Sequence, residues 1–323
     1  MKKITILTRE VSIGSCILRG LRNLIRFIRK ILIKRVLDFD LLKYGGSHPA
    51  VTRSLINGFS KTKTFFNFNP LFSSAVGQIV IVLSDMDALR QAINWKQNSK
   101  IEKLIAGPNI IELPDESEKI LASPEIDIWI VPSAMTIEIY ERLNPALKGR
   151  VKSWYAGVDE NFWLPGHLKN KKKVLIYQKN SPTPFFKKVE QKLKEHGFVT
   201  ETVIYGRYSK KEYFKYLDES AFAIFLSIAE TQGIALVEAW SMDVPTIVWD
   251  PEIEHYYIRG LKTTASPYLS EETGMRWKEL REFETIITNL NDCLQKFSPR
   301  KWVLNNMTDA KSTQQLLEIL NYN

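Results

Sequence analysis

Residues 226–249 read Leu226-Ser-Ile-Ala-Glu-Thr-Gln-Gly-Ile-Ala-Leu-Val-Glu-Ala-Trp-Ser-Met-Asp-Val-Pro-Thr-Ile-Val-Trp249, and they carry the clearest structural pattern of the chain. An apolar strand ends near Leu226, and a loop carries Glu230. Gly233 then lets the backbone turn closely into a helix that starts near Ile234. A second apolar run follows at Pro245–Trp249. A strand, a helix and a strand in this order indicate a βαβ unit of a parallel sheet.

The same window holds groups suited to bind phosphates and hydroxyls. Free N–H groups at Gly233, Ile234 and Ala235, with the positive end of the helix dipole, form an anion site. A carboxylate can accept hydrogen bonds from neighbouring sugar hydroxyls, and the window offers Glu230 on the loop and Glu238 in the helix. Taken singly, Glu230 is typical of a helix N-terminal acid and Glu238 of a solvated helix residue. The joint pattern indicates a nucleotide sugar as ligand.

Strand-like and helix-like patterns alternate outward from this window along the whole chain. The expected strands are apolar at nearly every position, as in parallel sheets covered on both faces: Ile4–Leu7, Ile79–Leu83, Ile126–Val131, Val174–Tyr177, Ala221–Leu226 and Pro245–Trp249. The expected helices are Ala134–Leu143, Phe185–His196, Lys210–Leu217 and Ile234–Ser241. The sequence therefore predicts an α/β fold with parallel sheets.

A turn-rich stretch at 157–166, followed by Lys169–Lys173, marks the expected domain boundary. We expect an N-terminal Rossmann-like domain over residues 1–163, a C-terminal Rossmann-like domain over 164–303, and a helix over 304–323.

Several landmarks in order resemble the retaining GT-B glycosyltransferases, especially glycosyltransferase family 4. The 226–249 window is similar to that family's E-x7-E region. Ile130-Val-Pro-Ser133, Trp154-Tyr-Ala-Gly-Val-Asp159 and Phe162-Trp-Leu-Pro165 resemble its interdomain passage, and Phe297-Ser-Pro-Arg-Lys-Trp302 its closing segment. The resemblance covers roughly residues 125–323 well and the first 124 only loosely. It implies two Rossmann-like domains facing across a cleft, with a C-terminal helix crossing back to the first.

The resemblance implies a role for each matching residue. Glu230 would contact the transferred sugar and act as the catalytic residue, and Glu238 would bind the ribose hydroxyls. The amides of residues 233–235 would meet sugar and phosphate. Lys179, directly after a strand, is the candidate cation for the diphosphate. The remaining donor-side candidates are Lys187 or Lys188 as a second cation, and Arg207 near the nucleobase.

The first domain matches the family less closely. Many relatives carry a histidine there that touches the donor sugar, and His48 is the candidate, on the acceptor side. Gly14 is the best representative of the family's glycine loop and a candidate donor contact. His255 follows a strand end and is a weaker ligand candidate.

Neither a metal nor a resident cofactor is expected, with the nucleoside-diphosphate sugar as co-substrate. Asp85 and Asp87 have a D-x-D spacing after a strand, so a metal-binding role for them stays open. In a GT-B frame the helix N-terminus and lysines neutralise the departing diphosphate instead.

The chain carries +9, and its basic character is local. Residues 11–37 contain seven basic residues and no acid, opposite an apolar stripe at helical spacing. This pattern favours an amphipathic helix over 17–37 that lies on an anionic membrane or contacts an acidic acceptor through Arg22, Arg26 and Arg29. A solvated face on a helix that packs against the sheet is the alternative.

Composition excludes several classes. A chain of 323 residues with 44% hydrophobic and 25% charged residues is globular, and two distant cysteines argue for a reducing cytoplasm. Nucleic acid is disfavoured because 11–37 holds a single aromatic, Phe27. The sequence thus favours a cytoplasmic glycosyltransferase, peripheral on the inner face of the membrane, that uses a glycan or lipid-linked acceptor in cell-envelope glycan synthesis. A non-catalytic membrane or polyanion-binding module and a GT-B nucleotide-sugar epimerase are the alternatives.

Overall fold

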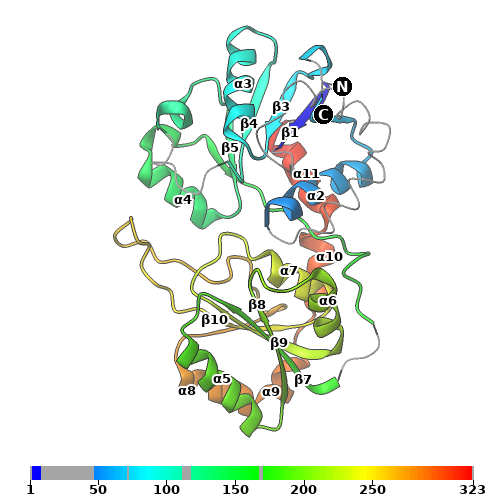
Figure 1. The fold of residues 1–323 in the computed structure, drawn as a ribbon, viewed down its shortest axis with the longest axis vertical. Helices are drawn as coiled ribbons and strands as arrows, with labels where there is room; N and C mark the ends of the chain where they lie inside the picture. The colour runs from blue at the N-terminus through cyan, green and yellow to red at the C-terminus, as the bar shows by residue number, and fades with distance from the viewer. Residues whose placement is uncertain (1, 9–46, 71–72, 111–117, 167–169, 322–323) are drawn as a thin grey trace, which may run out of the picture. The chain divides into compact units, whose positions relative to one another are not determined.

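The computed structural model describes residues 2–8, 47–70, 73–110, 118–166 and 170–321 of the chain (Figure 1). It divides into two compact units. Unit 1 comprises Met1–Trp154 and Thr313–Asn323, and unit 2 comprises Tyr155–Ser312. Each unit has its own parallel sheet.

The sheet of unit 1 has six strands in the described residues, in the order β2-β1-β3-β4-β5-β6. The strands are β1 (Ile4–Leu7), β2 (Phe66–Phe68), β3 (Ile79–Val82), β4 (Lys103–Ala106), β5 (Ile128–Val131) and β6 (Val151–Ser153). The described residues of this unit form the helices α2 (Ser47–Lys61), α3 (Met86–Gln97) and α4 (Ala134–Leu143), with 3-10 turns at Ser73–Ala75, Glu118–Ala122 and Pro145–Leu147.

The sheet of unit 2 has five strands in the order β11-β10-β9-β7-β8, and its pairings are parallel. The strands are β7 (Asn170–Lys179), β8 (Val199–Ile204), β9 (Ser220–Ser227), β10 (Thr246–Trp249) and β11 (Gly274–Trp277). The helices are α5 (Thr183–Glu195), α6 (Lys210–Glu219), α7 (Ile234–Ser241), α8 (Leu280–Thr288), α9 (Leu290–Leu294), α10 (Pro299–Asn306) and α11 (Asp309–Ile319), whose residues from Thr313 on belong to unit 1.

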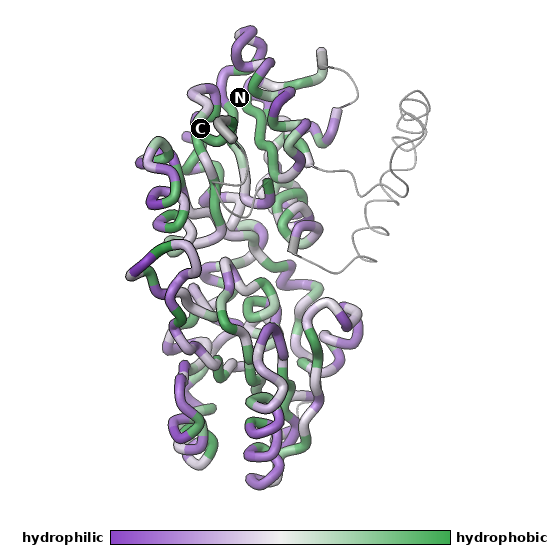
Figure 2. Tube along the Cα trace, turned by 60° about the vertical axis from the view of Figure 1, so that its left-hand side comes forward, coloured by the Kyte–Doolittle hydropathy of each residue, from purple (hydrophilic) through white to green (hydrophobic). Residues whose placement is uncertain are grey.

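Alternate residues of the central strands β7 and β9 pack into two separate cores. Leu175 and Phe225 point into the cluster formed with α6, α7 and α10, whereas Ile176 and Ile224 join the cluster formed with α5, α8 and α9. Figure 1 shows these two sets of helices on either side of the sheet. Burial on both faces explains why the strands are continuous apolar runs. Figure 2, coloured by hydropathy, shows hydrophobic residues mainly on the inner segments of the chain.

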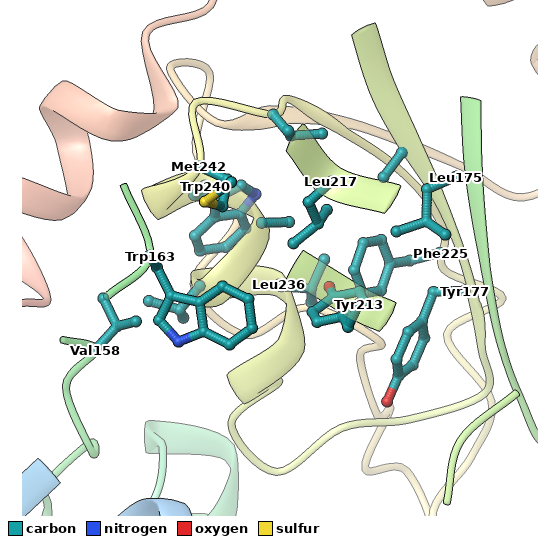
Figure 3. Packing of buried hydrophobic residues seen from close by; sticks show 14 of the residues in the cluster. Val158, Trp163, Leu175, Tyr177, Tyr213, Leu217, Phe225, Leu236, Trp240 and Met242 are labelled. Carbon is teal, nitrogen blue, oxygen red and sulfur yellow. The ribbon is translucent and has the colours of Figure 1, made fainter. Parts of the chain in front are cut away.

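The core beside α7 is rich in aromatic rings (Figure 3). Trp163 and Trp240 are nearly fully buried there, and the Trp163 ring lies 5.8 Å from that of Tyr213. Because Trp163 belongs to the connecting stretch, this stretch packs as part of unit 2.

The division between units differs from the expected boundary after residue 163. The chain passes from unit 1 to unit 2 after Trp154, and the contacts of Gly157 and Val158 within unit 2 explain this position. A Cβ on Gly157 would lie 2.5 Å from the carbonyl oxygen of Thr308, and the Val158 N–H donates to Met307 at 2.9 Å. The turn-rich stretch at 157–166 marks a change of composition, whereas the packing of unit 2 already begins at Tyr155. The second change falls at Ser312, instead of after residue 303.

The expected strands and helices all occur in the structure, and Ala134–Leu143 and Ile234–Ser241 keep their bounds. In place of one helix over 304–323, α10 and α11 are separated at Met307 and Thr308. The basic segment 17–37 lies outside the described residues. Among the described helices, none is long and apolar enough to span a membrane.

Candidate functional site

Four residues with reactive or binding side chains follow consecutive strand ends in unit 2. Lys179 is the last residue of β7, Tyr205 follows β8, Glu230 lies in the loop after β9, and Asp250 follows β10. The carboxyl ends of parallel strands share one edge of a sheet, and this edge is where open α/β sheets bind ligands. The parallel pairing therefore gathers these side chains.

Lys179 and Glu230 form an ion pair at this edge. The Nζ atom of Lys179 lies 2.8 Å from Oε2 of Glu230, and the two side chains are only 19% and 14% exposed. The Ser227 hydroxyl donates to Oε1 of Glu230 at 3.1 Å. Lys179 also lies over the Tyr205 ring, 4.6 Å from its centroid. The pair is thus held from both sides.

The backbone of Glu230 is bonded to Thr264, whose hydroxyl donates to the buried acid Asp250. The Glu230 N–H donates to the carbonyl oxygen of Thr264 at 2.9 Å. Asp250, which is 1% exposed, accepts hydrogen bonds from the Thr264 hydroxyl at 2.6 Å and the Ala265 N–H at 2.8 Å. Arg276 donates to the same carboxylate at 3.1 Å. Asp250 therefore fixes the segment on which the Glu230 loop is anchored.

Gly233 begins α7 in the left-handed conformation, with φ 79° and ψ 54°. Glycine adopts this conformation without a Cβ penalty. A glycine at the N-cap has no side chain to accept the first N–H groups of the helix, so those of Ile234 and Ala235 are available to an anion. The start of α7 therefore has the geometry of an anion site between Glu230 and Glu238.

Glu238 lies in the second turn of α7 and is 8% exposed. Oε1 of Glu238 is 3.9 Å from Nζ of Lys210, the first residue of α6. Lys210 in turn lies 5.9 Å from the centroid of the Trp163 ring. A buried acid paired with a lysine contradicts a solvated helix position for Glu238.

Three tyrosines lie near the two acids. Burial raises the pKa of Tyr177, Tyr208 and Tyr213, and in each case neighbouring tyrosines or an acid add to the effect. The charge of Glu238 raises the pKa of Tyr208, and that of Glu230 contributes at Tyr177. The Tyr213 hydroxyl donates to the Ala235 carbonyl at 2.7 Å. All three are therefore neutral hydrogen-bonding groups near pH 7.

The structure does not bring every donor-side candidate to this edge. Lys187 and Lys188 are exposed on α5, whose buried residues pack on the sheet face opposite α7. Arg207 is exposed in the turn after β8, where its N–H donates to Ile204 at 2.9 Å. Its neighbour Tyr205 is the part of this turn that reaches Lys179. His255 is half-buried, and burial lowers its pKa.

The remaining candidates belong to unit 1. His48 is exposed in the first turn of α2. Asp85 caps α3, because its side chain accepts from the N–H groups of Asp87 and Ala88. In the part of the chain that the structure describes, no group of three or more His, Cys, Asp or Glu side chains could hold a metal ion. Gly14, Arg22, Arg26 and Arg29 lie outside the described residues.

Sequence reasoning missed five contributors: Lys210, Ser227, Asp250, Thr264 and Arg276. Two of them had a usable signal. Asp250 is an acid directly after an apolar strand, and Lys210 starts a helix whose N-cap Ser209 and Glu212 form a capping box. Thr264 joins through folding of the long segment between β10 and β11, and Arg276 through the pairing of β11 with β10, and no local pattern reveals either contact.

No known family model matches the chain, and no curated protein matches it. Solved structures do. TarM has a TM-score of 0.52 at 14% identity, over 75% of this chain and 54% of its own. HepE from Anabaena, in complex with UDP-glucose, has a TM-score of 0.52 at 12% identity, over 100% of both chains. A glycosyltransferase from Rickettsia africae has a TM-score of 0.55 at 13% identity, over 98% and 97%.

These identities show the fold alone. The chain spans about half the length of TarM and the whole of HepE. The α/β architecture with two parallel sheets, expected from the sequence, is confirmed as that of the GT-B glycosyltransferases.

Proposed function

We propose that this protein is a glycosyltransferase that moves a sugar from a nucleoside-diphosphate sugar to a hydroxyl group of a glycan or lipid-linked acceptor, with retention of configuration. The observation that carries the proposal is the arrangement around α7. The partly buried Glu230 and the buried Glu238 each lie beside a lysine, with the amides of the helix start between them. The GT-B fold supports the proposal, and HepE with its fold was solved in complex with UDP-glucose.

The donor would bind at the carboxyl edge of the unit 2 sheet. Glu238 would accept hydrogen bonds from the ribose hydroxyls, with Lys210 fixing its carboxylate. The amides of Ile234 and Ala235 and the ammonium group of Lys179 would face the diphosphate. Glu230 would then accept hydrogen bonds from the transferred sugar, once the diphosphate draws Lys179 away from it.

These groups suit the chemistry of the transfer. When the bond from the anomeric carbon to the diphosphate breaks, its electron pair moves to the phosphate oxygen, and negative charge grows there. Lys179 and the α7 amides are preorganised cationic or dipolar groups where that charge develops, in a partly buried site where electrostatic interactions are strong. The Glu230 carboxylate, which lies 2.8 Å from the Lys179 ammonium group, suits the positive charge that develops on the sugar.

The proposed acceptor contacts and the proposed membrane location depend on other residues. His48 and Gly14 are proposed contacts to acceptor and donor, and Arg22, Arg26 and Arg29 to an acidic acceptor or to anionic lipid. The basic segment 17–37 would hold a cytoplasmic enzyme on the inner face of the membrane.

Donor hydrolysis over a panel of nucleotide sugars tests the proposal. The purified chain is incubated with UDP-, GDP-, dTDP- and ADP-sugars, and the released nucleoside diphosphate is measured. We expect one nucleotide class to be hydrolysed slowly, and the Glu230→Ala variant to slow the release further. Conversion of the donor to an isomeric nucleotide sugar would identify an epimerase instead. Absence of nucleotide binding for the whole panel would contradict the proposal.

A further inference from the structure

The segment between β10 and β11 folds into a hairpin. It spans residues 253–263 and appears in Figure 1 as the gold loop that runs out from the second sheet. An antiparallel bridge joins Glu254 and Lys262, and the N–H of His255 donates to the carbonyl of Leu261 at 2.7 Å. At the base of the hairpin, the N–H of Thr263 donates to Ile253 at 2.8 Å. The backbone is therefore ordered by its own hydrogen bonds.

Two apolar side chains anchor the hairpin. Ile258 is 7% exposed and Leu261 is 5% exposed. Their neighbours in the sequence are exposed to solvent instead. Tyr256 is 89% exposed and Tyr257 56%, with ring centroids 4.8 Å apart at 87°. The hairpin thus buries its aliphatic residues and presents two adjacent aromatic rings to solvent.

The hairpin is continuous with the candidate site. Thr264, the residue after its base, accepts the hydrogen bond from the Glu230 N–H. The Thr264 hydroxyl is in turn held by Asp250, the residue that precedes the hairpin by a short turn. Both ends of the hairpin are therefore fixed next to the loop that carries Glu230, within the same unit.

The charge around the rings points to a neutral ligand. Glu252 lies 3.8 Å from Lys262 and 2.7 Å from Lys278. The Glu254 carboxylate accepts a hydrogen bond from the Gly260 N–H, and the hairpin also carries Arg259. Acids and bases are thus mixed, whereas a surface that binds anionic lipid or polyanions has an excess of cations. Exposed tyrosines offer an apolar ring face together with a hydroxyl, and this combination fits the apolar face and hydroxyls of a sugar ring.

We propose that Tyr256 and Tyr257 form a stacking platform for a sugar ring of the acceptor, so that the acceptor of this enzyme is a saccharide or carries one. This inference rests on the proposed glycosyl transfer and adds the acceptor class. The platform lies on the unit that carries Glu230, on a hairpin followed directly by Thr264, the residue that accepts a hydrogen bond from the Glu230 N–H.

Saturation-transfer difference NMR on the full chain tests the platform. The probes are methyl α- and β-glucoside, methyl β-galactoside, methyl β-N-acetylglucosaminide and maltose, each with and without UDP. We expect at least one of them to receive saturation through the protons of its apolar face. The Tyr256→Ala/Tyr257→Ala double variant should bind it about tenfold more weakly. Tyr256→Phe, which keeps the ring, should retain most of the affinity.

Phe65→Ala is the matched control, because Phe65 is an aromatic residue that is 70% exposed in unit 1. It should leave saccharide binding unchanged. If the wild type binds none of the probes, or if the double variant keeps its affinity, the platform is not a saccharide site. Loss of binding to neutral phosphatidylcholine vesicles in the double variant, with unchanged saccharide binding, would assign the rings to a membrane and overturn the proposal.

UDP affinity, measured by calorimetry on the same variants, separates this inference from the proposed function. It should be equal in wild type and double variant. A chain that binds saccharide but no nucleotide would contradict the glycosyltransferase proposal, whereas one that binds nucleotide but no saccharide would contradict only the platform.

Discussion

The ammonium group of Lys179 and the carboxylate of Glu230 lie 2.8 Å apart, although the residues are on different strand ends. The pair joins the last residue of β7 to the loop after β9. Each side chain neutralises the other in a site that is mostly shielded from water. A diphosphate that binds Lys179 must therefore compete with Glu230, and its binding would free the carboxylate for the sugar.

Lys179→Gln should weaken binding of nucleoside diphosphate by about tenfold or more, because a charge-assisted hydrogen bond to phosphate contributes roughly 1.5–3 kcal/mol. Binding of the free nucleoside should change little. Calorimetric titration with both ligands measures the difference. Lys187→Gln is the control, since Lys187 is exposed on α5, and it should behave as wild type. Equal losses for nucleoside and nucleoside diphosphate would remove Lys179 from the phosphate site.

Glu238→Ala should weaken donor binding, whereas Glu230→Ala should mainly slow turnover. Loss of a buried hydrogen bond to a ribose hydroxyl should cost about 1–3 kcal/mol in donor binding. Nucleotide titrations and turnover rates separate the two effects. Glu271→Ala, at an exposed position between β10 and β11, serves as the control. Wild-type nucleotide affinity in the Glu238 variant would contradict its assignment to the ribose.

Asp250→Asn should lower both stability and turnover, with a smaller effect on donor affinity. Asparagine keeps one acceptor but loses the charge that holds Thr264 and Arg276, at a cost of about 1.5–3 kcal/mol in unfolding free energy. The Glu230 loop then loses its fixed anchor. Urea unfolding and steady-state kinetics measure the two effects.

Asp127→Asn provides the comparison for Asp250. Asp127 pairs with Lys96 at 2.9 Å and accepts from the Leu104 N–H at 2.7 Å, all within unit 1. Its loss should lower stability without changing turnover in the folded protein. Turnover that stays at the wild-type value in Asp250→Asn would refute the positioning role.

Stability should fall steeply above pH 10. Burial raises the pKa of Tyr177, Tyr208 and Tyr213 above the ordinary value of about 10, so the folded protein holds these protons more tightly than the unfolded chain. Below about pH 10 the three tyrosines contribute their full stabilisation to the folded protein. Above it, each group lowers the unfolding free energy by about 1.4 kcal/mol per pH unit.

Urea unfolding at several pH values between about 9 and 11 measures this slope. Tyr213→Phe should reduce it, and should also cost about 1 kcal/mol at every pH through the lost hydrogen bond to Ala235. If Tyr213→Phe had the same slope as wild type, Tyr213 would ionise as readily in the folded protein as in the unfolded chain.

The basic segment 17–37 should bind anionic but not neutral vesicles, and salt should weaken the binding. Each Lys or Arg near an anionic surface contributes about 1 kcal/mol, so charge reversal at Arg22, Arg26 and Arg29 should release the protein. Co-sedimentation measures the bound fraction. A wild type that stays in the supernatant with anionic vesicles at low salt would show that the basic face is simply solvated.

The order of buried strands and of several helices could be read from the sequence. Ile234–Ser241 was predicted with its observed bounds, because Gly233 and the apolar residues after it are local signals. Strands such as Ala221–Leu226 were evident because both faces are buried, which leaves no polar alternation. Edge and short strands were missed: β8 reads Val-Thr-Glu-Thr-Val-Ile with exposed residues, and β2 has three residues.

The tertiary structure decided which charged residues meet. Lys179 could be placed after a strand and Glu230 in a loop, but their pairing depends on β7 and β9 being neighbours in the sheet. Lys187 and Lys179 look alike in the sequence, yet α5 turns Lys187 to solvent on the other face. Local propensity and hydrophobic period are properties of neighbouring residues, so they specify elements. Contacts between residues far apart in the chain arise only when the elements pack, and these contacts make the site.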